Sequence, residues 1–243
     1  MGQLEGKTAI ITGAGTGIGK GIARAFAEEG AKLIIASRNR ENLESTAAEL
    51  RPHGKEVLVI PTDVTDEEQV VSLFEKTMNE IERLDILVSN SGVFDGGPFD
   101  ELSLETWQKV IDVNLTGPFL CGREAMKIMK QQVGGRIINI GSISAQMPRM
   151  NSAPYTTSKH GLVGLTKAMA LEGRDHGVVV SALHPGNVLT ERRAASEQSA
   201  DQEPMMTTDE LAMTAVTMAA LPLHVNMLQA IVLPTTQLYV GRG

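Results

Sequence analysis

The chain has 243 residues, of which 42% are hydrophobic and 3% aromatic, and it carries a net charge of -7. An acidic chain with no basic stretch argues against a nucleic-acid-binding surface, and no apolar run reaches the length of about 18 residues that a membrane-spanning helix needs. The single Cys121 cannot form an internal disulfide and is typical of a reducing compartment, so we expect a cytoplasmic protein. The length suits one domain over residues 1–243.

Short apolar runs alternate with helical patterns along the chain. Seven runs are expected to form strands: 7–12, 31–36, 57–60, 85–90, 136–140, 178–183 and 230–233. Helices are expected between them: from the glycines after the first run to Glu29, over 41–50, from a capping box at 65–68, over 104–132, and from Tyr155 onward. Continuous apolar runs separated by helices indicate strands buried on both faces. The pattern therefore predicts an α/β fold of the doubly wound (Rossmann) type, with about seven parallel strands flanked by helices.

A glycine-rich loop follows the first predicted strand and opens the first predicted helix. Glycines at such a junction permit a tight turn and let the backbone approach a pyrophosphate, and the helix start offers free amides to the phosphates. The loop therefore predicts a dinucleotide site. Its expected contacts are Gly13, Gly15, Thr16, Gly17, Ile18 and Gly19.

The end of the second strand indicates which dinucleotide is bound. It reads Ser37-Arg38-Asn39-Arg40 and lacks the carboxylate that would hold a free ribose hydroxyl. A guanidinium can hold a 2′-phosphate through charge-assisted hydrogen bonds, which favours NADP(H) over NAD(H). The alternative, that Arg38 and Arg40 are ordinary surface charges, stays open.

Tyr155 and Lys159 lie four residues apart at the start of a predicted helix. This spacing places both side chains on one helical face, where an ammonium lowers the pKa of a neighbouring phenol. The pair can therefore act as a proton donor and acceptor near neutral pH. Solvated helices often carry the same pair, so it does not establish a catalytic site by itself.

These features, with several motifs along the chain, resemble the short-chain dehydrogenase/reductase family over essentially the whole length. The matching motifs are Thr12-Gly13-x-x-x-Gly17-Ile18-Gly19, Asp63-Val64, Pro185-Gly186 with Thr190, and the four catalytic positions Asn114, Ser142, Tyr155 and Lys159. One motif departs from the family: Ser89-Asn90-Ser91-Gly92 stands where Asn-Asn-Ala-Gly is usual.

The resemblance implies a role for each catalytic position. Ser142 would hold the substrate carbonyl or hydroxyl, Tyr155 would give or take the proton, and Lys159 would bind the nicotinamide ribose. It also implies further cofactor contacts: Ser37, Arg38, Asp63, Val64, Asn90, Gly92, Tyr155, Lys159, Pro185, Gly186, Val188 and Thr190. No metal is expected, because the histidines and the cysteine have no ligand spacing.

Asn114 is expected to point inward, on a stripe with Trp107, Ile111 and Pro118. Pro118 has no N–H to donate to the Asn114 carbonyl four residues earlier, so we expect an irregular helix at this point and a free acceptor. In the resembled family this asparagine holds a water that connects the lysine to solvent. We hypothesise that the proline helps to free that acceptor.

The substrate is less well specified than the chemistry. The tail, at 221–226 and 233–239, is similar to NADP-dependent 3-hydroxy acid (serine-type) dehydrogenases, whose small acid substrate could be held by Arg149, Arg192 or Arg193. A 3-oxoacyl thioester (acyl carrier protein) reductase and a non-catalytic NADP-binding regulatory protein are the alternatives. Specificity is expected to reside in 94–99, 145–152 and 191–208. The last segment is polar and is either a mobile surface loop or a lid, and its place after a strand's carboxyl end favours the lid. The family also suggests a homo-oligomer, a dimer or tetramer.

Overall fold

The computed structural model describes residues 2–53, 56–132, 134–194 and 203–238. A seven-stranded sheet forms its centre, in the order β3-β2-β1-β4-β5-β6-β9, and every pair of neighbours is parallel. The strands are β1 Thr8–Thr12, β2 Lys32–Ser37, β3 Val57–Pro61, β4 Ile86–Ser89, β5 Gly135–Ile140, β6 Val178–Pro185 and β9 Gln229–Val232. Each predicted run is therefore a strand, within one or two residues at its ends.

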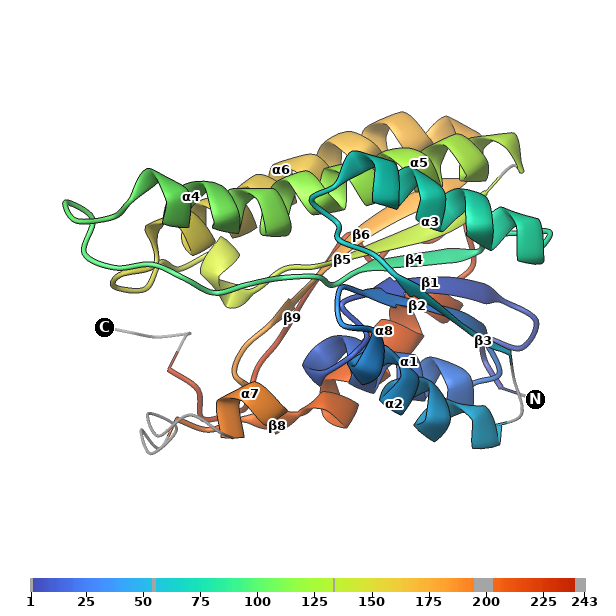
Figure 1. Ribbon diagram of the computed structural model, residues 1–243, viewed down its shortest axis with the longest axis horizontal. Coiled ribbons are helices and arrows are strands. Elements are labelled where there is room, and N and C mark those ends of the chain that lie inside the picture. The colour runs from blue at the N-terminus through green and yellow to red at the C-terminus, as the bar shows by residue number, and fades with distance from the viewer. Residues whose placement is uncertain (1, 54–55, 133, 195–202, 239–243) are drawn as a thin grey trace.

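Helices cover both faces of this sheet, which confirms the doubly wound arrangement (Figure 1). The helices α1 Gly17–Glu28, α2 Arg40–Leu50 and α8 Thr208–Ala220 lie on one face. The other face carries α3 Glu67–Glu80, α4 Leu104–Ile111, α5 Gly117–Gln131 and α6 Ala153–Gly173. A short two-stranded sheet, which was not predicted, pairs β7 Val188–Leu189 with β8 Met206–Thr207 on either side of α7 Glu191–Ala194.

Two apolar clusters hold the layers together, one on each face of the sheet. Ile11, Phe26 and Leu211 belong to the first, which joins β1 to α1 and α8, and Ile10, Phe74 and Met129 belong to the second. Because neighbouring residues of a strand point to opposite faces, Ile10 and Ile11 supply one cluster each. The strands β1, β4, β5 and β6 are buried along their whole length, as the continuous apolar runs predicted.

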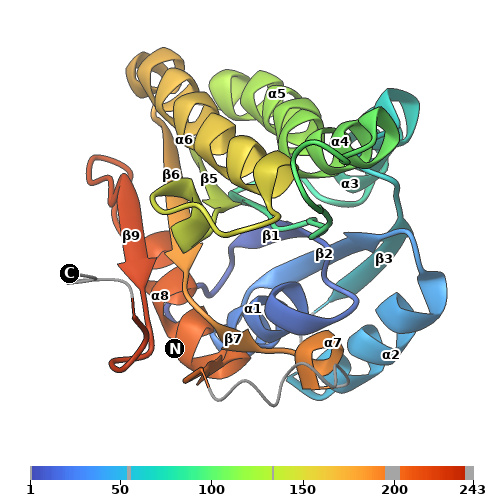
Figure 2. The same ribbon diagram turned by 90° about the vertical axis from the view of Figure 1, so that its left-hand side faces the viewer.

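The chain reverses its direction of winding between β1 and β4, which are neighbours in the sheet. In doubly wound sheets such a reversal opens a crevice beyond the carboxyl ends of the two strands. Figure 2 views this edge of the molecule, where α7 lies beside the start of α1. In the described part of the chain, no helix is both long and apolar enough to cross a membrane.

Two local predictions need correction. The residue that caps α3 is Asp66, whose carboxylate accepts the Gln69 amide, and not Thr65, because Asp66 is the last residue with extended backbone. The predicted helix over 104–132 is not a continuous α-helix. A π-helical turn at Asp112–Thr116 separates α4 from α5, and the amide of Gly117 donates to the carbonyl of Asp112, five residues back. An irregularity at this place was predicted from Pro118; its π-helical form was not.

Candidate active site

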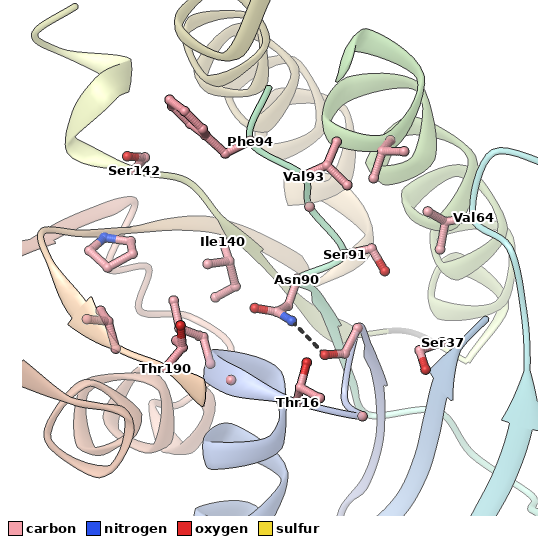
Figure 3. A pocket seen from close by; sticks show the side chains of 18 of the residues that line it. Thr16, Ser37, Val64, Asn90, Ser91, Val93, Phe94, Ile140, Ser142 and Thr190 are labelled. Atoms are coloured by element: carbon pink, nitrogen blue, oxygen red, sulfur yellow. Dashed lines mark hydrogen bonds between the residues drawn. The ribbon is translucent and has the colours of Figure 1, made fainter. Parts of the chain in front are cut away.

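A cavity of about 440 Å³ opens at the crevice and brings together residues from most of the chain. Of the eighteen expected cofactor contacts, all but Gly19 line it, and so does Ser142 among the expected catalytic residues. Figure 3 shows Ser142 and Phe94 toward one end, Ser37 and Val64 toward the other, and Asn90 between them. Phe94, Glu191 and Arg193, from the segments expected to set specificity, also line it. Sequence reasoning missed seven further lining residues: Asn42, Thr62, Ser91, Val93, Val113, Ile140 and Gly141.

The glycine loop forms the floor of the middle of the cavity. Gly13 and Gly17 have φ angles of 65° and 58°, in the left-handed region that favours glycine. A Cβ on Gly13 would also lie 2.8 Å from Nδ2 of Asn90. Gly19 does not line the cavity: any side chain there would collide with the Gly13 carbonyl, so this glycine permits close packing, and its contact with a cofactor stays a prediction.

Asn90 ties the end of β4 to the glycine loop. Its Nδ2 donates to the carbonyls of Thr12 and Gly13, at 3.0 and 3.2 Å. The hydroxyl of Thr12 in turn accepts the amides of Asn90 and Ser91, at 3.0 and 3.2 Å. The segment departs from the usual family motif at Ser89 and Ser91. The side chain that bonds to the glycine loop belongs to Asn90, where the chain matches the motif.

The end of the cavity that contains Ser37 and Val64 is polar and carries one cation, from the residue after β2. Arg38, directly after β2, lines the cavity with an exposed side chain, while Arg40 is directed to Glu44, 3.6 Å away. Asp63 lines the same end, and its Oδ1 accepts the amide and hydroxyl of Thr65, at 3.0 and 2.8 Å. Arg38 and Arg40 are therefore not equivalent, and Arg38 is the one that borders the cavity.

Lys159 and Tyr155 stand one turn apart on α6 at the opposite end of the cavity. The ammonium of Lys159 donates to the Ile140 carbonyl over 2.8 Å, and it lies 5.6 Å from the centre of the Tyr155 ring. Burial lowers the pKa of Lys159 to about 8. The Phe94 ring meets the Tyr155 ring edge-on, with 5.1 Å between ring centres. A cation of reduced pKa beside a phenol can support proton transfer near neutral pH.

Ser142 is held by its own turn and by contacts with a buried histidine, His184, which sequence reasoning did not relate to it. The Ser142 hydroxyl accepts the amide of Ser144 at 3.1 Å and so caps a short 3-10 turn. His184 lies fully buried at the end of β6, with Nδ1 3.4 Å from the Ser142 nitrogen and 3.2 Å from the Ser142 carbonyl oxygen. Burial lowers the pKa of His184, which favours the neutral imidazole.

Asn114 is fully buried and does not line the cavity, yet it braces the cavity wall. Its side chain accepts the amide of Val93 at 2.8 Å and donates to the carbonyl of Val93 at 2.9 Å and to the hydroxyl of Ser158 at 3.2 Å. It sits in the π-helical turn, a feature that often marks functional sites. The water proposed at its carbonyl stays a prediction.

The segment after Thr190 contacts the glycine loop directly. The carboxylate of Glu191 accepts the amide of Gly17 at 2.9 Å, at the first residue of α1. Part of the predicted lid, residues 195–202, lies outside the described part of the chain, as does the side chain of Arg192. Arg193 lines the cavity, so of the three arginines expected near the pocket it is the one found there.

Arg149 was one of three arginines that could take a substrate carboxylate, but it makes other contacts. Its Nη2 donates to Oδ1 of Asn187 over 3.0 Å and lies 3.9 Å from the carboxylate of Glu203, and Arg149 is not among the residues lining the cavity. Its charge is therefore already paired with an acid from the far side of the lid segment. Within the described ranges, no three histidine, cysteine or acidic side chains converge as metal ligands would.

Comparison with protein families gives one match over most of the chain: the family described as short chain dehydrogenase, over residues 7–201. An uncharacterized oxidoreductase of Bacillus subtilis, YxjF, is 42% identical over 188 residues, which is 77% of this chain and 73% of that protein. A 3-oxoacyl-[acyl-carrier-protein] reductase of Synechocystis is 36% identical over 79% of this chain and 78% of the relative.

Solved structures extend this similarity to nearly the whole length. A short-chain type dehydrogenase/reductase from Mycobacterium marinum is 34% identical, with a TM-score of 0.88 over 94% of each chain. A variant of actinorhodin polyketide ketoreductase, determined with NADPH, is 31% identical, with a TM-score of 0.87 over 96% of this chain and 98% of that one. The predicted likeness of the tail to 3-hydroxy acid dehydrogenases stays a prediction.

Proposed function

The chain belongs to the short-chain dehydrogenase family of oxidoreductases, and we propose that it uses NADP(H) to interconvert a secondary alcohol and a ketone or aldehyde. The observation that carries this proposal is the buried ammonium of Lys159 beside Tyr155 at the end of the cavity that also contains Ser142. In this proposal, these residues supply a proton relay and a hydrogen-bond donor to the substrate carbonyl group.

The cavity fits a nicotinamide cofactor, which the family uses. Gly13 has no side chain, and there is no room for one beside Asn90. The bare backbone of the loop can therefore approach a pyrophosphate, and the start of α1 offers its amides to the same group. Arg38 would hold the 2′-phosphate, with Ser37 beside it, and Asp63 and Val64 would border the adenine. When bound, the nicotinamide donates or accepts the hydride. An NADPH complex of the related polyketide ketoreductase supports the choice of NADP.

Each catalytic side chain has a defined task at the reacting end. Ser142 orients the carbonyl oxygen of the substrate by donating its hydroxyl proton. Tyr155 donates its phenolic proton to that oxygen in reduction and removes the proton from the alcohol in oxidation. Lys159 stabilises the phenolate by its charge, and Asn114 braces the wall that carries Val93 and, in our hypothesis, holds a water that returns the proton to solvent.

The alternatives differ in substrate or in class. A 3-oxoacyl thioester reductase is favoured by the Synechocystis relative, whose name states that activity. A small 3-hydroxy acid would need a cation for its carboxylate, and Arg193 is the described candidate at the cavity. A non-catalytic NADP-binding protein is disfavoured because Ser142, Tyr155 and Lys159 are all present and grouped. We further propose one catalytic domain, a cytoplasmic location and assembly as a homo-oligomer.

A substrate panel tests the proposal. The protein would be assayed with ketones, hydroxy acids, polyols and acetoacetyl thioesters while NADPH absorbance is followed. Turnover of at least one carbonyl compound with NADPH is expected, and a preference for thioesters would identify the reductase alternative. Tight NADPH binding with no turnover of any member would favour the non-catalytic protein.

A further inference from the structure

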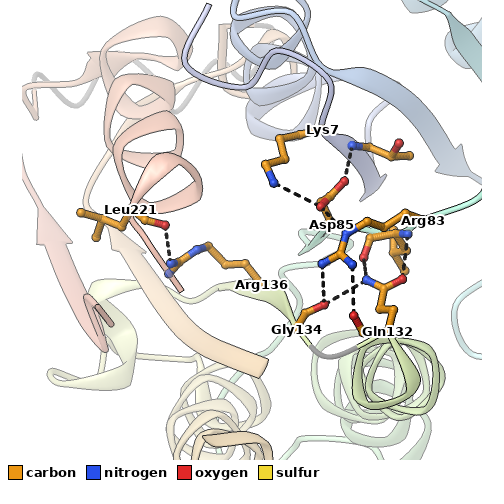
Figure 4. Close-up of polar contacts among 9 residues, drawn as sticks. Lys7, Arg83, Asp85, Gln132, Gly134, Arg136 and Leu221 are labelled. Carbon is orange, nitrogen blue, oxygen red and sulfur yellow. Dashed lines mark hydrogen bonds and ion pairs between the residues drawn. The ribbon is translucent and has the colours of Figure 1, made fainter. Parts of the chain in front are cut away.

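A second cavity, of about 190 Å³, lies at the amino ends of the strands, opposite the cofactor crevice at their carboxyl ends. It is bordered by residues that precede or begin strands, Lys7 before β1, Asp85 before β4 and Arg136 in β5, together with the segment after α8. Figure 4 shows Lys7 and Arg83 directed to Asp85, and Arg136 reaching toward Leu221. None of these side chains takes part in the proposed oxidoreductase chemistry.

The charges around this cavity do not balance. Three cationic side chains line it, Lys7, Arg83 and Arg136, against the carboxylate of Asp85. That carboxylate already has two cationic partners: it accepts from Lys7 Nζ at 3.3 Å and from Arg83 Nε at 2.9 Å, and also from the Thr8 amide at 3.1 Å. Arg136 therefore has no acidic partner in the described part of the chain.

Arg136 is the most unusual member of the group, because its side chain is only 1% exposed. Its Nη2 donates to the carbonyls of Leu221, Pro222 and Val225, at 2.9, 3.2 and 3.3 Å. Its Nε and Nη1 have no hydrogen-bond partner among the described residues. Burial lowers the pKa of this guanidinium, and no neighbouring acid opposes that effect. A buried charge with unsatisfied donors is costly unless a counter-ion meets it.

A purely structural role explains only part of this arrangement. The bonds from Nη2 anchor the loop that leads from α8 to β9, and a cation is also favourable at the C-terminus of a helix. An anchor of this kind does not require Nε and Nη1 to remain without acceptors. It also does not require two more cations at the same cavity.

We propose that this cavity binds a small oxyanion, of the phosphate or carboxylate type, held by Arg136 with Lys7 and Arg83 adding positive charge. Because Nε and Nη1 are almost completely inaccessible, the guanidinium would shift toward the cavity as the ligand supplies the acceptors that these atoms lack. Because Arg136 also anchors the α8–β9 loop, binding at this site would stabilise the edge of the sheet at β9. The site is separate from the cofactor cavity and does not depend on the proposed redox function.

Equilibrium dialysis of the full chain with radiolabelled inorganic phosphate tests the site, at constant ionic strength set with sodium chloride. Phosphate could also meet the cofactor cavity, so Arg38→Ala serves as the matched arginine control. We expect saturable binding by the native chain and by Arg38→Ala, and binding about tenfold weaker or less in Arg136→Met. Acetate that competes would place carboxylates in the ligand class, and acetate that does not compete would restrict it to phosphate-like anions.

The double variant Lys7→Gln with Arg83→Gln keeps the loop anchor and decides the matter should Arg136→Met fail to fold. It is expected to bind phosphate several-fold more weakly than the native chain because two nearby charges are gone. The proposal is overturned if phosphate shows no saturable binding, if Arg38→Ala abolishes it, or if the double variant binds phosphate as well as the native chain.

Discussion

The ammonium of Lys159 lies 5.6 Å from the centre of the Tyr155 ring, one helical turn along α6. The same ammonium is held by the Ile140 carbonyl at the end of β5, so a strand and a helix together fix the pair. The position of the charge is therefore set by the sheet and not by the flexible side chain alone. This relationship makes the phenol of Tyr155 the proton donor and acceptor of the proposed reaction.

Removal of the Lys159 charge should change how stability depends on pH. Burial lowers the pKa of Lys159 from 10.5 to about 8, so above pH 8 the folded chain loses a proton that the unfolded chain retains until about 10.5. The unfolded state then binds more protons, and stability rises with pH over that window. Relative to Lys159→Met, the native chain should gain unfolding free energy between pH 7 and 10 in urea titrations. A constant difference between the two proteins over this range would contradict the burial of a charged lysine.

Arg38 should determine the choice between NADP(H) and NAD(H). Its exposed guanidinium borders the cavity next to Ser37, where a 2′-phosphate would lie. Loss of a charge-assisted hydrogen bond in Arg38→Ala should weaken NADPH binding about tenfold or more, with little change for NADH, as measured by fluorescence titration.

The neighbouring Arg40 provides the control for that experiment. Arg40 is directed to Glu44 on α2 and is not among the residues lining the cavity. Arg40→Ala should therefore leave both affinities unchanged. Equal weakening of NADPH by the two substitutions would indicate a general surface charge effect, and tighter binding of NADH than NADPH by the native chain would reject the assignment of NADP.

Glu191 should oppose cofactor binding. Its carboxylate accepts the amide of Gly17 at the start of α1, where the glycine loop would meet a pyrophosphate. Two anionic groups compete for one donor, and a charge near a helix N-terminus is typically worth about 0.3–1 kcal/mol. Glu191→Gln should thus bind NADPH roughly two- to fivefold more tightly by calorimetry. Weaker binding in the variant would mean that Glu191 instead holds the segment closed over the cofactor.

The local motifs were predictable because short-range rules govern them. Apolar runs gave all seven strands of the sheet, and the glycine pattern located the loop with its two residues of positive φ. The spacing of Tyr155 and Lys159 placed them on one face of α6. Pro118 indicated where the helix would be irregular, but its π-helical form depends on packing that the sequence pattern does not contain.

The missed contacts join residues that are distant in the chain. Glu191 meets Gly17 across 174 positions, His184 meets Ser142 across 42, and Arg136 meets Leu221 across 85. No periodicity or local motif relates such pairs, since they meet only when the sheet order is known. The packing of Gly19 against Gly13 likewise becomes visible only in the coordinates.

The most direct test of the proposed function is turnover by Tyr155→Phe, with the best substrate of the panel and NADPH absorbance as the readout. Loss of the phenolic proton should lower kcat at least about a hundredfold, because general acid–base catalysis typically contributes that much or more. NADPH affinity should stay unchanged, since the ring and its contact with Phe94 remain. Turnover by Tyr155→Phe at the native rate would contradict the assignment of Tyr155 as the proton donor.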